Sequence, residues 1–342
     1  MKSYVLVKPQ DLKIEEREVP FPKDDEVLIK VTNVGICGSD IHLFKGSYNG
    51  PSNYPMLFGH EWSGIVEKVG KNVVEFVAGD KVTGDCSSYC GHCEYCKKDR
   101  NLCSSIEKYG ITIDGASSEY IVRNKRHIYK ANPASDLELL SLTEPIAVAK
   151  HLIEKIITLT NNITDKSILV YGGGAIGQAA LLLLKKHYGC KNVDLSDLVE
   201  NRIIMAKSFG ANIPSPDKLK WSLENNYYNM YNNTTYDIII ETTGVASVFK
   251  NAFNLLKPLG VLGCVGMIAS VDIPQKLIVT KSLTVTGSIG GTEEFEEVID
   301  FIQNNKEDVA KLISHKYKIK DAAKAFETAL DTSVSMKVNL EI

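Results

Sequence analysis

Apolar and polar positions between residues 165 and 290 predict strands that alternate with helices. Short apolar runs, which fit buried strands, are each followed by a longer run with helical periodicity. The strand runs are 167–171, 192–196, 236–241, 260–265 and 283–287, and the helical runs are 178–186, 202–209 and 248–256. Strands that alternate with helices in this way predict βαβ units around a parallel sheet.

The first 130 residues show a different pattern, in which short apolar runs are separated by frequent turn residues. Runs such as 26–31 and 64–69 lie between proline and glycine positions, among them Pro20, Pro22 and Gly79. Short strands with frequent turns predict an irregular β-rich domain, barrel-like or sandwich-like. Residues 212–236 are instead polar and rich in asparagine, and we expect a helix and a surface loop there.

Composition restricts the possible partners and locations of the chain. Its 342 residues favour two domains. With 39 basic and 42 acidic residues the net charge is −3, so we expect no nucleic-acid partner. The N-terminus carries no apolar export signal. The apolar stretch 168–184 is interrupted by three glycines and is shorter than the about 20 residues of a membrane-spanning helix. We therefore expect a cytoplasmic protein with no membrane partner.

A glycine-rich segment follows the strand predicted at 167–171. Gly172, Gly174 and Gly177 fit the pattern G-x-G-x-x-G, and Asp197 lies 20 residues further on, at the end of the next strand. The helix N-terminus would bind the pyrophosphate of a dinucleotide. Asp197 would accept hydrogen bonds from the ribose and repel a 2′-phosphate, which favours NAD over NADP, although Arg202 would offset part of that repulsion.

The alternative is a tight strand-to-helix turn in which Asp197 only caps a helix. The strand, turn, helix and acid occur in the order of the dinucleotide fingerprint, so we favour cofactor binding. The further residues that we assign to the cofactor site are Ala175, Ile176, Thr243, Val265 and Gly266.

Four cysteines fall within fourteen residues, at Cys90, Cys93, Cys96 and Cys103. Thiolates at such close spacing can complete a tetrahedron around zinc, and four protein ligands leave no open position. We therefore predict a structural zinc site, with four free thiols as the alternative. Cys86, just upstream, is interpreted as not being a ligand.

A second set of possible ligands is widely spaced and consists of Cys37, His60, Glu61 and Glu144. A catalytic zinc needs about three protein ligands and an open position. No local spacing forces these four residues together. Taken by themselves, they are better interpreted as a core cysteine, a core histidine and two surface acids.

Considered together, these residues resemble the zinc-dependent medium-chain alcohol dehydrogenase superfamily over the whole chain. Gly59-His60-Glu61 with the later Gly64, Gly70 and Val73 is similar to the zinc signature of that superfamily. Residues 34–42 resemble its first zinc-ligand segment, and 79–82 and 114–120 are also typical of it. Residues 143–148 and 197–202 resemble the polyol, or sorbitol-type, dehydrogenase branch.

The resemblance implies an α/β fold, with a Rossmann doubly wound parallel sheet and a β-rich GroES-like catalytic domain. The catalytic domain would span 1–147, with 289–342 returning to it, and the NAD-binding domain would span 148–288. The run 283–287 would form the edge of the Rossmann sheet. An edge strand this apolar invites pairing with a second subunit, so we expect a homodimer or homotetramer.

The resemblance also implies two zinc ions per chain, one catalytic and one structural. Cys37 and His60 would hold the catalytic zinc, and Glu61 would be a third or an alternate ligand. Glu144 replaces the cysteine of the simple alcohol dehydrogenases and would bind the metal directly or through water. Asp40 would hold the far ring nitrogen of His60.

Ser39 and His42 would lie near the substrate hydroxyl and pass its proton outward. The activity implied is oxidation of a secondary alcohol on a small polyol or sugar-like substrate, with hydride transfer to NAD. Two departures from the family are visible. The interval between Cys96 and Cys103 holds six residues where the family usually has seven, and 287–292 lacks an arginine-containing motif of sorbitol dehydrogenases, which argues against sorbitol itself.

Other substrates stay open within the same family. A threonine-type amino alcohol, an aminocyclitol or a sugar phosphate would be oxidised with the same pair of glutamates. A more remote alternative is a non-catalytic NAD-binding protein, and zincless quinone reductases share the fold. Both would lack the zinc ligands that this chain retains.

Overall fold

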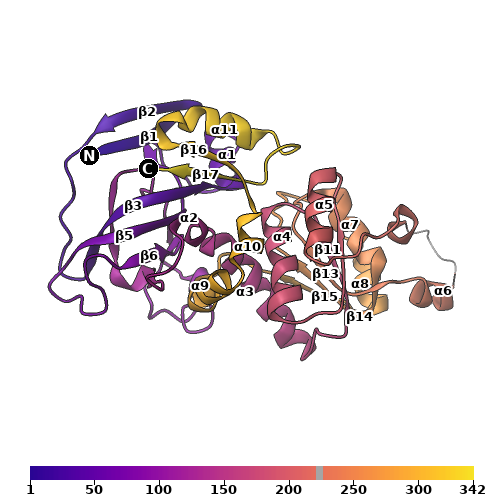
Figure 1. The fold of residues 1–342 in the computed structure, drawn as a ribbon. Coiled ribbons are helices and arrows are strands. Elements are labelled where there is room, and N and C mark those ends of the chain that lie inside the picture. The colour runs from indigo at the N-terminus through magenta and orange to yellow at the C-terminus, as the bar shows by residue number, and fades with distance from the viewer. Residues whose placement is uncertain (221–225) are drawn as a thin grey trace. The chain divides into compact units, whose positions relative to one another are not determined.

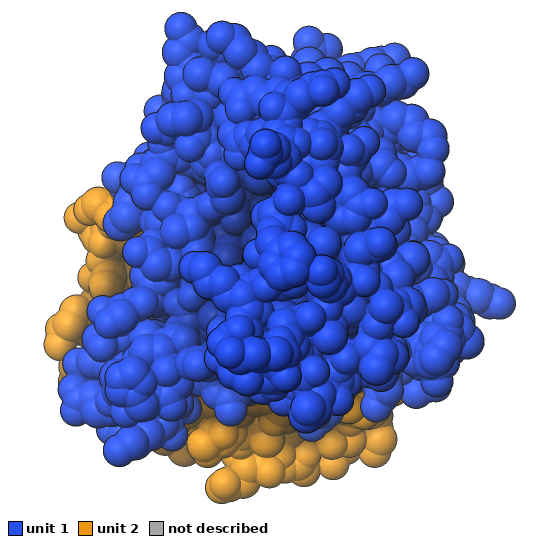
Figure 2. Space-filling view, turned by 90° about the vertical axis from the view of Figure 1, so that its left-hand side faces the viewer, with its two compact units in different colours: residues 1–147, 290–342 blue, residues 148–289 orange. Residues whose placement is uncertain are grey.

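In the computed structural model of the protein, residues 1–220 and 226–342 are described, and they divide into two units (Figure 1). The first unit contains residues 1–147 and 290–342, and the second contains 148–289 (Figure 2). The chain thus returns to the first unit at Gly290, one residue after the expected position.

The first unit is built mainly from short strands, as the pattern of turns predicts. Its elements before the crossing are β1 Lys2–Lys8, β2 Asp11–Glu16, β3 Glu26–Ile36, α1 Gly38–Lys45, β4 Met56–Leu57, β5 Glu61–Val69, β6 Lys81–Gly84, β7 Ser87–Ser88, η1 Arg100–Leu102, β8 Glu107–Lys108, β9 Tyr120–Asn124, η2 Lys125–His127, β10 Ile128–Lys130, α2 Leu137–Leu140 and the start of α3 Thr143–Thr160. After the return they are η5 Thr292–Glu294, α9 Phe295–Asn304, α10 Lys306–Ala310, β16 Ile313–Lys318, η6 Ile319–Asp321, α11 Ala322–Leu330 and β17 Lys337–Glu341.

Strand β3 organises this unit because it pairs with three others. The main sheet has the order β10-β6-β5-β3-β17-β16, and β9 also pairs with β3. In the antiparallel register Gly35 lies opposite Glu61, and Ile36 lies opposite Val338. The end of β3 is therefore held next to the start of β5 and next to the last strand of the chain.

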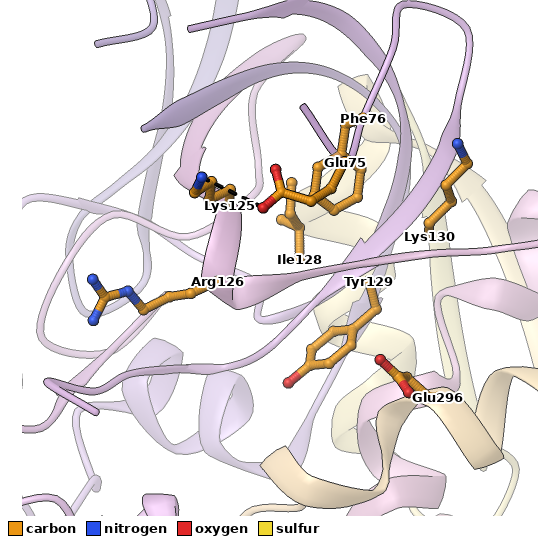
Figure 3. Close-up of a pocket in the computed structure, with 8 residues that line it drawn as sticks. All are labelled: Glu75, Phe76, Lys125, Arg126, Ile128, Tyr129, Lys130 and Glu296. Atoms are coloured by element: carbon orange, nitrogen blue, oxygen red, sulfur yellow. Dashed lines mark ion pairs between the residues drawn. The ribbon is translucent and has the colours of Figure 1, made fainter. Parts of the chain in front are cut away.

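A cavity of about 390 Å³ opens on the first unit and includes residues of η2 and β10 in its lining (Figure 3). Its two lysine side chains already have acidic partners, and the Arg126 guanidinium donates to the Cys90 carbonyl at 3.1 Å. The Lys125 ammonium lies 3.4 Å from Glu75, and the Lys130 ammonium lies 2.7 Å from Asp80. None of the predicted site residues lines this cavity.

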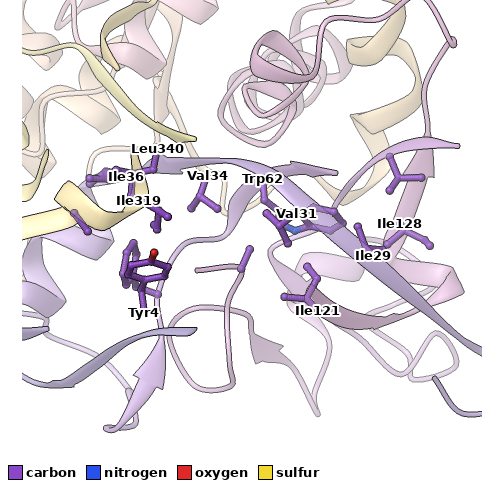
Figure 4. Close-up of a cluster of buried hydrophobic side chains, with 14 of the residues drawn as sticks. Tyr4, Ile29, Val31, Val34, Ile36, Trp62, Ile121, Ile128, Ile319 and Leu340 are labelled. Carbon is purple, nitrogen blue, oxygen red and sulfur yellow. The ribbon is translucent and has the colours of Figure 1, made fainter. Parts of the chain in front are cut away.

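The core of the first unit lies against β3, whose apolar residues are buried along most of its length. Ile29 and Val34 are completely buried, as is Trp62 at the start of β5 (Figure 4). Burial of each such aliphatic side chain contributes about 1.5–3 kcal/mol relative to exposure. The core thereby fixes the two strands that carry the candidate metal ligands.

The second unit has the predicted alternation of strands and helices. Its elements after α3 are β11 Ser167–Tyr171, α4 Ala175–Leu182, the π-helical turn η3 Leu183–His187, β12 Asn192–Ser196, α5 Glu200–Ser208, η4 Pro216–Leu219, α6 Tyr227–Asn232, β13 Tyr236–Glu241, α7 Ala246–Leu255, β14 Leu256–Cys264, α8 Gln275–Lys281 and β15 Thr284–Gly287.

These strands form one parallel sheet in the order β12-β11-β13-β14-β15, which confirms the Rossmann-type expectation. Helix α4 starts at Ala175, three residues before the expected run, because Gly174 serves as its extended N-cap. The helix and loop expected at 212–236 correspond to η4 and α6 in part, and residues 221–225 lie outside the described residues.

Strand β15 is the edge of this sheet, as the family resemblance implies for the run 283–287. In the part of the chain that the structure describes, no helix has both the length and the apolarity required to cross a membrane.

Candidate active site and cofactor sites

Three of the widely spaced candidate ligands meet at one point of the first unit. Cys37 is the N-cap of α1, directly after β3, whereas His60 and Glu61 lie at the start of β5. Their ligand atoms all lie within 4.8 Å of one another. The antiparallel pairing of β3 with β5 produces this meeting, since it places Gly35 opposite Glu61.

One buried oxygen that belongs to this group, Glu61 Oε2, lacks a hydrogen-bond partner, whereas the unbonded His60 Nδ1 faces Asp40 across 3.8 Å. Burying a polar atom without a partner is costly, so such atoms suggest a missing ligand. Sulfur, nitrogen and oxygen donors at this separation match the ligand chemistry of zinc. The group therefore fits a catalytic zinc ion.

Acidic groups surround His60. Burial by itself would lower the pKa of His60, but the nearby Asp40 and then Cys37 raise it well above its usual value. Asp40 is itself fully buried, and its carboxylate accepts hydrogen bonds from the backbone N–H groups of Cys37 at 2.9 Å and Gly59 at 3.1 Å. This concentration of negative charge favours a bound cation.

The expectation that Asp40 holds the far nitrogen of His60 needs a qualification. Asp40 Oδ2 lies 3.8 Å from His60 Nδ1, which is an ion-pair distance and too long for a hydrogen bond. Both carboxylate oxygens of Asp40 instead accept hydrogen bonds from backbone N–H groups. Asp40 therefore stabilises the backbone at Cys37 and Gly59 and also faces the His60 ring.

Glu144 lies beside this group but outside the set of three. It is in the first turn of α3 and is 6 % exposed. Burial raises its pKa, while His60 and the nearby Cys86 thiol act in the opposite direction. Cys86 therefore faces the catalytic group, which agrees with its exclusion from the four-cysteine site.

Ser39 and His42 both lie on α1, the helix that begins directly after Cys37. Ser39 Oγ lies 3.4 Å from His60 Nε2, so its hydroxyl borders the metal group. His42 is exposed, and its Nδ1 lies 3.0 Å from Ser47 Oγ. Ser39 thus lies next to the ligands, and His42 is open to solvent further along the same helix.

The four clustered cysteines form a second metal group in the first unit. The ligand atoms of Cys90, Cys93, Cys96 and Cys103 lie within 4.8 Å of one another. Backbone N–H groups of Ser104 and Cys96 lower the pKa of the Cys93 thiol to about 5, which favours the thiolate that binds metals. The shortened interval before Cys103 does not separate it from the others.

The cysteine segment is tied to the returning chain. The backbone N–H of Arg100 donates to Glu293 at 2.9 Å, and Asn101 accepts a hydrogen bond from the Thr292 hydroxyl at 2.8 Å. These contacts hold a segment that has few apolar residues of its own.

The glycine-rich loop of the second unit has the geometry of a phosphate-binding turn. Gly172 adopts φ +107°, which is accessible to glycine and strained for other residues. A Cβ at Gly177 would lie 1.9 Å from the Gly172 carbonyl oxygen, whereas a Cβ at Gly174 would meet nothing within 4 Å. The first turn of α4, with Ala175 and Ile176, follows this open space and presents its backbone N–H groups.

Asp197 follows the neighbouring strand β12 and ties the loop in place. Its carboxylate accepts hydrogen bonds from the backbone N–H of Gly173 at 2.6 Å and of Val199 at 2.8 Å. Arg202 lies 3.5 Å from the same carboxylate. Asp197 does not cap a helix directly, because the N-cap of α5 is Val199.

The carboxyl ends of β13 and β14 lie on the same side of the sheet as the glycine-rich loop. Shortly after these strand ends come Thr243, Val265 and Gly266. The buried Glu241 connects these segments. Its side chain accepts hydrogen bonds from the backbone N–H of Thr243 and Gly244, and its carbonyl accepts from Val265 at 3.1 Å. Ligands of parallel α/β sheets bind at this edge, so the second unit fits a dinucleotide.

Sequence reasoning missed three residues in the surroundings of the candidate ligands. Lys337 forms a buried ion pair with Glu61, Cys86 lies close enough to Glu144 to lower its pKa, and the Lys108 ammonium donates to Ser87 Oγ. None of them belongs to a motif, and each reaches its place through strand pairing that local sequence does not reveal.

Comparison with known proteins agrees with the two-unit fold and with the zinc chemistry inferred above. Residues 23–133 match the family described as "Alcohol dehydrogenase GroES-like domain", and residues 175–304 match "Zinc-binding dehydrogenase". The chain is 31 % identical to the starvation-sensing protein RspB of Escherichia coli K12, over 95 % of this chain and 94 % of that protein. It is 30 % identical to sorbitol dehydrogenase of Bacillus subtilis 168, over 96 % and 94 %.

Solved structures are similar over the whole chain. A crystal structure of an alcohol dehydrogenase from E. coli CFT073 with NADH has a TM-score of 0.87 and 30 % identity, covering 100 % of this chain and 99 % of that one. Galactitol-1-phosphate dehydrogenase of E. coli has a TM-score of 0.86 and 26 % identity, covering 99 % of each chain. The chain therefore belongs to the zinc-dependent medium-chain alcohol dehydrogenase superfamily, in the polyol dehydrogenase branch, and is an NAD-dependent zinc enzyme.

Proposed function

We propose that the protein oxidises a secondary hydroxyl group of a polyol or sugar-like molecule and passes the hydride to NAD. The observation that carries this proposal is the presence of two buried carboxylates, Glu61 and Glu144, beside Cys37 and His60. A ligand set rich in oxygen leaves room for a substrate that presents several hydroxyl groups. Relatives named sorbitol dehydrogenase support this substrate class.

In this proposal Cys37, His60 and Glu61 hold the catalytic zinc, and Glu144 binds it directly or through water. When bound, the ion supplies Lewis-acid chemistry toward the substrate oxygen. Lys337 keeps one oxygen of Glu61 occupied and leaves the other directed away from that pair. Cys90, Cys93, Cys96 and Cys103 would hold the structural zinc in a separate segment.

Ser39 would accept the proton released from the substrate hydroxyl. Its hydroxyl is partly exposed and lies 3.4 Å from the ring of His60, so it borders both the ligand group and solvent. His42 is exposed on the same helix and would pass the proton on. A proton relay by positioned side chains contributes about 10²–10⁴-fold to such reactions.

The dinucleotide would bind at the carboxyl edge of the sheet in the second unit. Backbone N–H groups at Gly174, Ala175 and Ile176 would face the pyrophosphate, and Gly172 and Gly177 would allow the close turn. Asp197 would bind the ribose, with Arg202 beside it, and Thr243, Val265 and Gly266 would line the remaining cofactor site. A carboxylate at Asp197 favours NAD over NADP.

We also propose that the protein is a homodimer or homotetramer. Among residues 1–220 and 226–342 no strand pairs with the outer side of β15, and Val285 on it and the adjacent Ile289 are 42 % and 46 % exposed. An apolar edge strand favours pairing with another copy. Light scattering coupled to size-exclusion chromatography would give the mass, and a monomer at micromolar concentration would contradict this proposal.

The function is tested by following NADH formation at 340 nm with zinc-loaded protein. The panel contains polyols, sugar phosphates, cyclitols, aminocyclitols, threonine and simple alcohols, each with NAD and with NADP. We expect NAD-linked oxidation of a polyol-type substrate that is abolished by Cys37→Ser. Threonine as the best substrate would favour the amino-alcohol alternative, which relatives named L-threonine 3-dehydrogenase keep relevant.

A further inference from the structure

Lys108, at the end of β8, carries a positive charge without a carboxylate partner. Its Nζ donates a hydrogen bond to Ser87 Oγ at 2.6 Å, across the pairing of β7 with β8. Among the described residues no Asp or Glu oxygen lies within ion-pair distance of this ammonium. The side chain is only partly exposed, so its charge has lost some of its hydration without gaining a counterion.

A short chain of contacts connects this ammonium to the catalytic group. Ser87 Oγ lies 3.6 Å from the sulfur of Cys86, and a Cβ at Gly110, two residues after Lys108, would lie 3.0 Å from the backbone of Gly59, which precedes His60. The contacts of 2.6 and 3.6 Å place the ammonium within about 6 Å of that sulfur, well inside the range of charge interactions. Lys108 therefore lies on the side of the candidate metal site that Glu144 and Cys86 form.

The half-buried Tyr48, on the loop after α1, lies in the same region. Burial raises the pKa of Tyr48, while Lys108 lowers it and Cys37 raises it, so the Tyr48 hydroxyl lies within the range of charge interactions with both residues. Cys37, Tyr48 and Lys108 all retain partial exposure. A molecule that reaches the metal group from solvent would meet the lysine and the tyrosine as well.

A simpler interpretation is that Lys108 only balances the negative charge of the buried acids Asp85 and Glu144. Asp85 uses one oxygen to accept a hydrogen bond from the backbone N–H of Ser87 at 2.8 Å, and neither acid forms an ion pair with the lysine. A lysine that served only as a counterion would be expected to contact one of them, as Lys337 contacts Glu61 at 2.6 Å. The ammonium instead keeps donor capacity for a further acceptor.

We propose that Lys108 binds an anionic group of the substrate, a phosphate ester or a carboxylate, so that the enzyme acts on anionic polyols in preference to neutral ones. This inference rests on the proposed function, because it concerns the substrate of the same site. The hydroxyl to be oxidised would approach Cys37, His60 and Glu61, and the anionic end of the same molecule would reach Lys108. Tyr48 would border the carbon chain between them.

The test uses matched substrates with the zinc-loaded enzyme and NAD. A pentitol and a hexitol are each compared with their terminal phosphate esters and with the matching sugar acids. We expect kcat/KM to be about tenfold or more higher for one anionic series, since a hydrogen bond to a charged group contributes about 1.5–3 kcal/mol and 1.4 kcal/mol is tenfold. The phosphate and carboxylate arms distinguish the two sources of charge.

Variants then assign the preference to this lysine. Lys108→Met should raise KM for the anionic substrate about tenfold with little change in kcat, and should leave the neutral substrate almost unaffected. Lys108→Arg should retain most of the preference. The exposed Lys320 serves as the matched control, and Lys320→Met should change neither constant.

Inorganic phosphate provides a measurement that does not depend on turnover. It should stabilise the native NADH-bound protein in thermal unfolding and compete with the anionic substrate, and Lys108→Gln should remove both effects. Equal kcat/KM for neutral and anionic members, unchanged in Lys108→Met, would overturn the role of Lys108 and leave the proposed function intact. Inactivity toward every polyol, charged or neutral, would instead reject the proposed function.

Discussion

Lys337 and Glu61 form a buried ion pair, with 2.6 Å between Nζ and Oε1 and side chains that are 4 % and 0 % exposed. The other oxygen of Glu61 has no partner and lies against Gly35, where a Cβ would be 2.4 Å away. Two strand pairings, β17 with β3 and β3 with β5, bring the pair together. The last strand of the chain thus orients a candidate zinc ligand from the first third of the sequence.

Lys337→Met is expected to destabilise the protein and weaken zinc retention together. Removing one partner of a buried ion pair leaves an uncompensated charge and costs about 3–5 kcal/mol. Urea unfolding and metal analysis after dialysis would measure the two effects. The matched control is Lys318→Met, whose pair with Glu341 is 59 % exposed on both sides and should contribute less than about 1 kcal/mol.

A second variant separates charge from packing at this position. Lys337→Met combined with Glu61→Gln should recover part of the stability lost in Lys337→Met, because the unpaired buried carboxylate is gone. Zinc retention should not recover with it. A double variant as unstable as the single one would show that Lys337 acts by packing and not by its charge.

Cys96→Ser is expected to remove the structural zinc and leave the catalytic one. Metal analysis of the purified protein should fall from two zinc ions per chain to one, since a four-ligand site loses its closed coordination with one thiolate. Cys190 is buried and lies outside both metal groups, so Cys190→Ala is the control and should retain both ions. Loss of zinc from the control would contradict the assignment.

Alanine substitutions at two glycines of the cofactor loop, Gly174 and Gly177, should weaken NADH binding for different reasons. Gly177→Ala places a Cβ 1.9 Å from the Gly172 carbonyl, so we expect an overpacking cost of about 1–3 kcal/mol and weak NADH binding. Gly174→Ala meets no protein atom within 4 Å, so its stability should be unchanged while NADH affinity falls. Thermal unfolding and NADH fluorescence titration would distinguish them, and normal NADH binding by Gly174→Ala would argue against pyrophosphate at this position.

Asp197→Asn is expected to relax the preference for NAD. The amide side chain can still accept from the backbone N–H of Gly173 or Val199, but it no longer repels a 2′-phosphate, and the positive charge of Arg202 is no longer opposed by a carboxylate at this position. We expect the ratio of kcat/KM for NAD to that for NADP to fall by about tenfold, from the loss of one charge–charge repulsion. Arg202→Leu in the same background should reverse the gain with NADP.

Because His127 is buried, we expect the free energy of unfolding to decrease in mild acid. Burial lowers its pKa to about 4 from the usual 6.5. Because the unfolded chain then binds more protons than the native one between these two values, stability is complete above pH 6.5 and decreases as pH falls toward 4. At 1.36 kcal/mol per pKa unit the contribution is about 3 kcal/mol. Urea unfolding at pH 7.0 and 4.5 measures it, and in His127→Gln this part of the pH dependence should be absent.

The alternation of strands and helices in the second unit was predictable because the signals are local. The strands at 167–171 and 236–241 each contain three consecutive buried aliphatic residues, as expected of strands buried on both faces of a parallel sheet, and 192–196 has Val193 and Leu195 buried. The glycine spacing of the cofactor loop is also local, since Gly172 and Gly177 meet within one turn. The four cysteines likewise lie close enough in sequence to form one metal group.

The catalytic group could not be predicted from spacing in the same way. Cys37 and His60 are separated by a loop, and only the register of β3 against β5 brings their side chains together. The resemblance to a known family identified these residues, and local pattern alone favoured a core cysteine and a core histidine. Helix starts differed by a few residues, because caps such as Gly174 and Val199 depend on backbone geometry.

The sequence by itself determined the fold class, the cofactor loop and the cysteine site, because each depends on residues that are near one another along the chain. Tertiary structure alone decided that Lys337 pairs with Glu61, that Cys86 faces Glu144 and that Lys108 lies nearby without a counterion. Charges separated by many residues interact only after strand pairing fixes their distance and burial removes the water that would screen them.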